Sequence, residues 1–174
     1  SIVNTEREQP LNFVAEGYTV VKVGDWYEVV PEATEYTINL AEDISADGND
    51  AAIWAMKNSV VTLNGEAKVH ATLGAENFST AVWALDGAKV TITGGTYTNE
   101  VLEGDDHVDL IYAKNGSTIE ITGGEFKCAT PKWTLNLKDE TESQIIVKGG
   151  RYYQFNPSIV NTEREQPLNF VAEG

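Results

Sequence analysis

The sequence predicts an all-β protein, a short parallel β-solenoid of about four to five coils with three strands per coil and one terminal β-hairpin. Three observations predict this class of fold. Internal repeats of about thirty residues run through the chain, each repeat holds short strands with alternating apolar residues, and glycine pairs stand at a fixed place in the repeats. Repeats of this length stack on one another and bury a continuous core.

The repeat is visible at four places along the chain. Its copies begin at Ala52, Ala81, Leu110 and Leu135, and the first copy is the weakest. One apolar position keeps its place in every copy: Leu63, Ile92, Ile121 and Val147. These residues are 29, 29 and 26 positions apart, a spacing that predicts one coil per copy. Coils stacked about 4.8 Å apart would pair each strand with its equivalents above and below.

Each copy reads as three short strands. In the second copy Val90 and Ile92 alternate with polar residues, which is typical of a half-buried strand. A glycine pair follows and predicts a tight corner: Gly94-Gly95, Gly123-Gly124 and Gly149-Gly150. One aromatic residue then stands at a fixed offset: Tyr97, Phe126 and Tyr152. We expect the inward residues to form ladders in the core, isoleucine over isoleucine and Trp54 over Trp83 over Tyr112.

Two elements precede the clear repeats. Residues 18–30 read as a β-hairpin that turns at Gly24-Asp25, with β-branched and aromatic residues on both arms. In a weaker segment that follows, Ile38 and Leu40 are expected to supply one strand of a starting coil. The predicted organisation has four parts: a linker copy at 1–17, the hairpin and a short linker at 18–35, the solenoid at 36–157, and a second linker copy at 158–174.

The same segment, SIVNTEREQPLNFVAEG, occupies residues 1–17 and residues 158–174. Because Ser1 and Ser158 are 157 positions apart, the sequence is one period of a 157-residue repeat plus an overlap. Three explanations stay open at this point. The chain is a slice of a tandem array of near-identical domains, or an engineered rearrangement that placed the hairpin at the front and kept the linker on both sides, or the overlap has no physical role.

The duplicated ends predict head-to-tail assembly. The linker after Val30 is short, so the hairpin should lie at the N-terminal end of its own solenoid. The last coil, from Leu135, would then expose unpaired strand edges, and such edges invite another chain. We expect the head of one molecule (residues 11–30) to dock on the last coil of another, a heterologous contact that builds rings or open fibres. The residues expected at this interface are Leu11, Phe13, Tyr18, Val20, Trp26, Leu168 and Phe170.

Composition excludes several partners. The formal net charge of -15 at pH 7 argues against nucleic acid and anionic membranes, since both would be repelled. No apolar run approaches the roughly eighteen residues of a membrane span, so we expect no membrane insertion.

The single Cys128 excludes an internal disulfide, and we expect a buried structural thiol because no histidine pattern accompanies it.

At this point the residues resemble a known family. The glycine-pair corners, the strand VTITGG at 90–95 and the segment FVAEGYTVVKVGDWYEVV at 13–30 resemble right-handed parallel β-helix proteins of the pectin-lyase-like type. More narrowly, they resemble small solenoid surface proteins of gut Bacteroidales and their phages. The resemblance implies a right-handed solenoid and an extracellular, cell-surface or virion-surface location. It says little about function, because this fold carries lyases, hydrolases, adhesins and phage spikes.

The stretch with the densest group of potentially catalytic side chains is the loop NEVLEGDDHVD at 99–109. Pectin-lyase-like enzymes use paired carboxylates as general acid and base or as Ca²⁺ ligands, which makes Asp105, Asp106 and His107 the minority candidates for catalysis. A weak Ca²⁺ site at Asp105, Asp106 and Asp109 is an alternative that lies between a catalytic loop and a merely solvated one. We expect a solvated acidic loop with no catalytic residue and no required cofactor. Four or five coils make a short groove, and no Arg-x-Lys arrangement stands ready to hold an anionic sugar.

Aromatic residues outside the repeat pattern suggest a second kind of contact. Trp133 and Tyr153 break the pattern and are expected to be exposed. Together with Phe78 they are the candidates for stacking on a glycan.

The sequence thus favours a non-enzymatic structural or adhesive module that stacks head to tail into an array or fibre and presents loops to glycans. Its expected partners are copies of itself and glycans. The alternatives are an engineered, rearranged solenoid that self-assembles, and a small polysaccharide lyase or hydrolase that uses the acidic loop.

Overall fold

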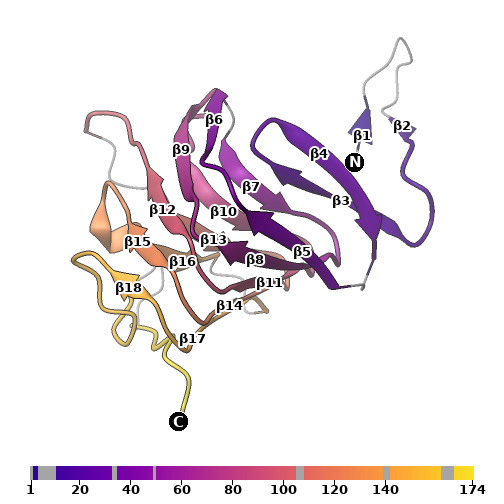
Figure 1. Ribbon diagram of the computed structural model, residues 1–174. Coiled ribbons are helices and arrows are strands. Elements are labelled where there is room, and N and C mark those ends of the chain that lie inside the picture. The colour runs from indigo at the N-terminus through magenta and orange to yellow at the C-terminus, as the bar shows by residue number, and fades with distance from the viewer. Residues whose placement is uncertain are drawn as a thin grey trace.

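The computed structural model describes residues 2–3, 11–32, 35–48, 50–104, 108–138, 142–161 and 167–174, with side chains from residue 13 onward except at 46–48. The chain winds into a β-solenoid of about four turns with three faces (Figure 1). The prediction of an all-β solenoid with three strands per coil is therefore confirmed.

Each face is a sheet in which equivalent strands of successive coils lie side by side. The first face holds β7 (Ala51–Ala55), β10 (Thr80–Ala84), β13 (Ile111–Ala113) and β16 (Leu135–Leu137). The second face holds β5 (Glu35–Leu40), β8 (Val60–Gly65), β11 (Lys89–Ile92), β14 (Thr118–Ile121) and β17 (Gln144–Val147). The third face holds β6 (Ile44–Gly48), β9 (Lys68–Gly74), β12 (Thr96–Asn99), β15 (Glu125–Lys127) and β18 (Arg151–Tyr152).

The predicted hairpin is confirmed and caps the N-terminal end of the solenoid. It consists of β3 (Tyr18–Val23) and β4 (Trp26–Pro31), and Gly24 in its turn has a φ of 56°. Strand β3 pairs antiparallel with β7, so the hairpin extends the first face. Two further short strands, β1 (Ile2–Val3) and β2 (Leu11–Asn12), pair with each other beside this end (Figure 1). A single 3-10 turn at Pro131–Trp133 is the one helical element in the described ranges.

The register of the solenoid follows the repeat read from the sequence. Ile92 of β11 pairs with Leu63 of β8 and with Ile121 of β14, and Ile121 pairs in turn with Val147. On the third face, Phe126 lies between Tyr97 and Tyr152. The starting coil is confirmed as well, because Ile38 pairs with Leu63.

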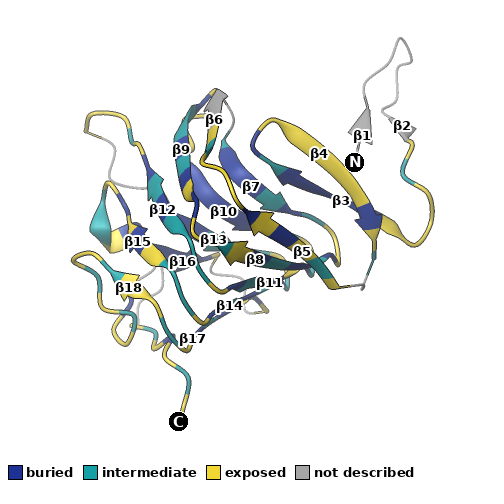
Figure 2. Cartoon of the chain, in the orientation of Figure 1, coloured by how far each residue is buried: buried dark blue, intermediate teal, exposed yellow. Residues whose placement is uncertain are grey.

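The core cluster draws apolar residues from strands of all three faces, and Figure 2 shows buried residues on these strands. On the second face the inward positions alternate with outward ones, so Val90 and Ile92 are buried while Lys89 is exposed. The aromatic rings of the third face stack nearly parallel, with centroids 5.1 Å apart for Tyr97 and Phe126. Stacked apolar residues therefore bury a continuous interior along the solenoid.

The predicted tryptophan ladder forms, and Trp83 at its centre is buried. Trp83 pairs with Trp54 and with Tyr112, and the ring centroids are 5.0 and 5.6 Å apart. Val82 and Ala84 belong to the core cluster, and since side chains alternate along a strand, Trp83 points to the outer side of the first face. The stacking was therefore predicted correctly and the burial only in part, since Trp54 and Tyr112 are half-buried and none of the three rings belongs to the central cluster. The run Ala-Val-Trp-Ala is apolar on both sides and gives no sign of which side faces that cluster.

The two glycines of each corner have different tasks. A Cβ built on Gly123 would overlap the carbonyl oxygen of Thr93 in the preceding coil, so the first glycine permits close stacking. Gly124 has a φ of 104°, a left-handed conformation that favours glycine. The same division of tasks recurs at Gly94-Gly95 and Gly149-Gly150.

Replacement of the first glycine should therefore weaken the whole stack. We expect Gly123→Ala to lower the free energy of unfolding by about 1–3 kcal/mol, as overpacking of a tight site does. Gly174→Ala is the matched control, since a Cβ there meets nothing within 4 Å and should change stability by less than about 0.5 kcal/mol. Urea denaturation followed by circular dichroism measures both, and equal stability of the two variants would contradict the close-stacking role.

Candidate functional site

The acidic loop is anchored at its C-terminal end. Asp105, Asp106 and His107 lie outside the described residues, so the predicted catalytic and cation sites are untested there. Asp109 is described and is buried, with 9% of its surface exposed. The backbone carbonyl of Val108 beside it accepts a hydrogen bond from Asn99 Nδ2 at 3.4 Å. In the described part of the chain, no group of three or more His, Cys, Asp or Glu side chains could hold a metal ion.

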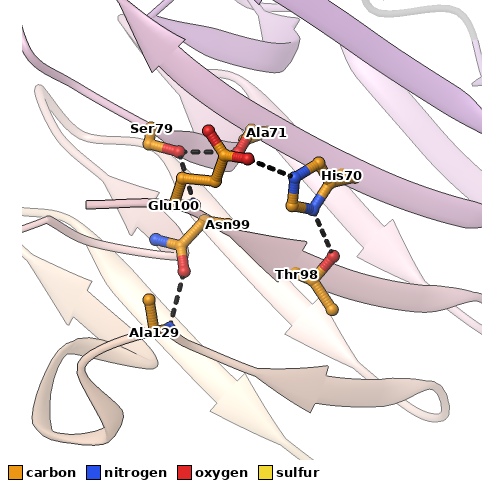
Figure 3. A network of polar contacts seen from close by, with 7 residues as sticks. All are labelled: His70, Ala71, Ser79, Thr98, Asn99, Glu100 and Ala129. Atoms are coloured by element: carbon orange, nitrogen blue, oxygen red, sulfur yellow. Dashed lines mark hydrogen bonds and ion pairs between the residues drawn. The ribbon is translucent and has the colours of Figure 1, made fainter. Parts of the chain in front are cut away.

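The third face carries a row of polar contacts that resembles a catalytic arrangement (Figure 3). His70 Nδ1 lies 2.7 Å from Thr98 Oγ1, and His70 Nε2 lies 3.3 Å from Glu100 Oε1. A hydroxyl, an imidazole and a carboxylate in this order are the parts of an activated nucleophile. Thr98, however, lies on β12 between β9 and β15, where the parallel ladders use the backbone N–H groups that an oxyanion would need. The contacts therefore tie neighbouring coils together.

Buried polar side chains extend this network toward the loops (Figure 3). Ser79 Oγ donates a hydrogen bond to the Ala71 carbonyl at 2.7 Å and accepts one from the Glu100 backbone N–H at 2.9 Å. Asn99 Oδ1 accepts a hydrogen bond from the Ala129 backbone N–H at 2.8 Å. The bonds of Ser79 to Glu100 and of Asn99 to Ala129 join different coils, so the network fixes the points where the loops leave the third face.

Two hollows run along the edge of the third face. One, of about 680 Å³, follows the glycine corners and is lined by polar groups such as Asn64, Thr93 and Glu125. The other, of about 300 Å³, is bordered by Lys127 and Tyr153. Lys127 Nζ lies 5.1 Å from the centre of the exposed Tyr153 ring. Arg151, which lines both hollows, forms an ion pair with Glu125.

The three aromatic candidates for glycan contact differ in how far they are exposed to solvent. Phe78 and Tyr153 are exposed, and the Phe78 ring centroid lies 5.5 Å from that of Trp83. Trp133 is buried, with 6% of its surface exposed, so the expectation of an exposed ring was wrong. The 3-10 turn at Pro131–Trp133 lies outside the repeat and turns this ring inward. Lys127 was not among the residues that the sequence suggested for glycan contact. Its position next to the inward Phe126 could have indicated an outward side chain.

The prediction of a buried thiol is confirmed at Cys128. Burial raises the pKa of this thiol to about 11, and the Asp109 carboxylate nearby acts in the same direction. Hydrogen bonds from neighbouring groups oppose the shift without cancelling it. Since only the thiolate is a nucleophile, the native side chain is inert.

Thiol labelling should therefore report on unfolding alone. At about pH 8 we expect Cys128 to react with a disulfide reagent more than tenfold more slowly in the native protein than in urea, because both exposure and thiolate formation require unfolding. Absorbance of the released thiol gives both rates. Fast labelling under native conditions would contradict the burial of Cys128.

The head end of the solenoid exposes apolar residues on an edge strand. Strand β4 has a partner on one side only, β3. Its residues Trp26, Tyr27 and Val29 are exposed, Trp26 by 77%. Tyr18, on the adjacent strand, is exposed as well. The head therefore presents a free strand edge together with an apolar surface, as expected for an interface.

Behind this edge lies a buried lysine. Lys22 Nζ lies 5.3 Å from the ring centre of Tyr27 and 5.9 Å from that of Trp54. Burial lowers the pKa of Lys22, and the carboxylates of Asp25 and Asp50 partly oppose this effect. Val20, which we expected at the interface, is also buried within the single chain.

The tail end differs from the expectation of open edges. Residues 158–174 fold back on the last coil, where Val171 forms a parallel bridge with Val147 of β17. Phe170 is buried with 5% of its surface exposed, and Leu168 packs against the same cluster. The second linker copy thus covers the edge of the second face, because its apolar residues complete the last coil. Strands β16 and β18 keep one partner each.

The two linker copies share one local pairing. In the second copy Val160 pairs antiparallel with Leu168, and in the first copy Val3 pairs antiparallel with Leu11. These residues are equivalent positions of the two copies. The side chains diverge where the first copy has no coil beneath it: Phe13, the equivalent of Phe170, is 68% exposed.

Comparisons with protein-family models, with curated proteins and with solved structures each find no match for this chain. Of the resemblance to pectin-lyase-like and to Bacteroidales or phage proteins, the structure supports the β-solenoid. None of the described helical residues forms a segment with the length and apolar character of a membrane crossing.

Proposed function

We propose that this protein is a non-enzymatic structural module whose copies stack head to tail into an array or fibre at a cell or virion surface. The observation that carries the proposal is the exposed apolar edge strand β4 at one end of a solenoid whose other end also holds strands with one partner. The two ends differ, so a contact between them is heterologous and propagates.

Strand direction favours such a stack. Strand β3 is antiparallel to β7 and β4 is antiparallel to β3, so β4 runs in the direction of the solenoid strands. Strands β4 and β16 are the two edges of the first face. In a coaxial stack, β4 of one molecule and β16 of the next would meet as a parallel pair and continue the sheet.

The charge distribution of the head is compatible with a strand–strand contact. Within β4, Glu28 is the one ionisable side chain apart from that of Tyr27, and Trp26 and Val29 supply apolar surface. Natural edge strands that must stay unpaired commonly carry lysine or an inward charge. Strand β4 has no lysine.

A lysine on this edge should therefore abolish association. We expect the weight-average mass of the wild-type chain to rise with concentration above the 19.0 kDa of one chain, and that of Val29→Lys to stay there. Thr91→Lys, at an outward position on β11, adds the same charge on a strand that has a partner on both sides and should behave as wild type. Multi-angle light scattering measures all three. A wild-type chain that remains monomeric at every concentration would overturn the proposal.

A second candidate function is glycan contact at the hollow beside Tyr153. The exposed Tyr153 ring, with Lys127 over it, offers the stacking surface and cation that a sugar carrying an acidic group needs. We expect an acidic oligosaccharide to shift amide resonances of β15 and β18 in wild type, with at least about tenfold weaker binding in Tyr153→Ala. Phe78→Ala, in the loop between β9 and β10, is the control, and an equal loss in both variants would contradict this site.

A further inference from the structure

We infer that the last coil is a receptor for the duplicated segment, filled in cis by residues 158–174 and in trans by residues 1–17 of a second copy of the chain. This inference deepens the proposed head-to-tail function, on which it rests, by naming the segment that passes between molecules and the site that receives it.

The receptor consists of groups outside the duplicated segment. The Val147 N–H donates to the Phe170 carbonyl at 2.7 Å, and the Val147 carbonyl accepts from the Ala172 N–H at 2.9 Å. The Pro157 carbonyl accepts from the Phe170 N–H at 2.9 Å. A hollow of about 340 Å³ beside these contacts is bordered by Tyr152. Because Val147 and Pro157 belong to the coil, the receptor remains if the occupant changes.

The first copy has what the receptor binds. Its sequence is identical to that of the second copy, so the backbone groups and side chains that dock in cis have counterparts in residues 1–17. The pairing of Val3 with Leu11 matches that of Val160 with Leu168, whose backbones exchange two hydrogen bonds of 2.8 Å. The first copy therefore already holds the pairing found in the docked segment, which reduces the ordering that docking requires.

The exposure of the two equivalent phenylalanines shows that only the second copy is docked on a partner surface. Phe170 is 5% exposed and Phe13 is 68% exposed, although their neighbours in sequence are the same. A large apolar side chain that is buried in one copy and exposed in the other marks a segment without its partner surface. The partner surface that fits it is the last coil of another chain.

Cis docking dominates in the wild-type chain. The second copy follows Pro157 directly, so its effective concentration at the receptor is roughly millimolar or higher, and a second molecule competes poorly at lower concentration. In trans, the hairpin of the incoming chain would begin where Gly174 now ends. Figure 1 shows that the C-terminus points away from the last coil, at the end opposite to the hairpin. Space for a further solenoid therefore exists there.

The test uses full-length chains and weakens the cis occupant. Phe170→Asp places a charge in the buried position and should free the receptor for residues 1–17 of other chains. We expect its half-assembly concentration to be at least roughly tenfold lower than that of wild type. The double variant Phe13→Asp with Phe170→Asp has the same weakened cis occupant and also a damaged first copy, so it should stay monomeric. Phe13→Asp alone should assemble less readily than wild type, because its first copy is damaged while its cis occupant is intact.

A competing peptide distinguishes this contact from others. The synthetic segment SIVNTEREQPLNFVAEG should cap the receptor of Phe170→Asp chains and return their mass to one chain, whereas the same peptide with aspartate in place of phenylalanine should not. Circular dichroism of Phe170→Asp and of the double variant verifies the fold. If Phe170→Asp unfolds the protein, Phe170→Ala with its matched Phe13→Asp partner replaces it.

Equal masses for Phe170→Asp and the double variant, or no effect of the peptide, would overturn the inference. The combination Phe170→Asp with Val29→Lys separates the two proposals. Assembly that survives Val29→Lys but not Phe13→Asp supports segment exchange and contradicts the β4 contact. Assembly that is lost with Val29→Lys, but does not respond to Phe13→Asp or to the peptide, supports the β4 contact and contradicts segment exchange.

Discussion

The close stacking of successive coils is the constraint on which the rest of this structure depends. Parallel strands in a ladder lie about 4.8 Å apart, and every corner must keep that spacing. At Gly123 the backbone of the preceding coil leaves no space for a Cβ. The same spacing places Ile121 directly beside Ile92 and aligns Phe126 with Tyr97. Core composition, corner chemistry and strand register are therefore consequences of one distance.

That constraint explains which features the sequence could predict. Because equivalent residues must pair, the spacing of Leu63, Ile92 and Ile121 was enough to establish the register. The direction of Trp83 was not predictable, since its strand is apolar on both sides. The burial of Trp133 depends on a 3-10 turn with no counterpart in the repeat. The docking of Phe170 was missed because identical sequence gives no sign that one copy is bound and the other is not.

Stacking also explains the polar flank. A solenoid places outward residues in rows, so side chains that are about thirty positions apart in sequence become neighbours. His70, Thr98 and Glu100 meet in this way on the third face. The coil spacing alone brings these side chains together, so their proximity does not indicate catalysis. Whether such a row could act on a substrate depends on the backbone N–H groups around it. The described flank consolidates the solenoid, and the ends distinguish this chain from a regular stack.

Exchange of one linker copy for the other at the last coil would be almost a thermoneutral reaction. The contacts of Val147 and Pro157 would be the same whichever copy supplies the phenylalanine, so the exchange by itself would leave the enthalpy nearly unchanged. The exchange would leave the translational entropy lost when two chains join and the entropy of the released segment. Chain length in an assembly of this kind would then depend on concentration, on confinement at a surface and on the β4–β16 pairing, and little on the exchanged contacts themselves.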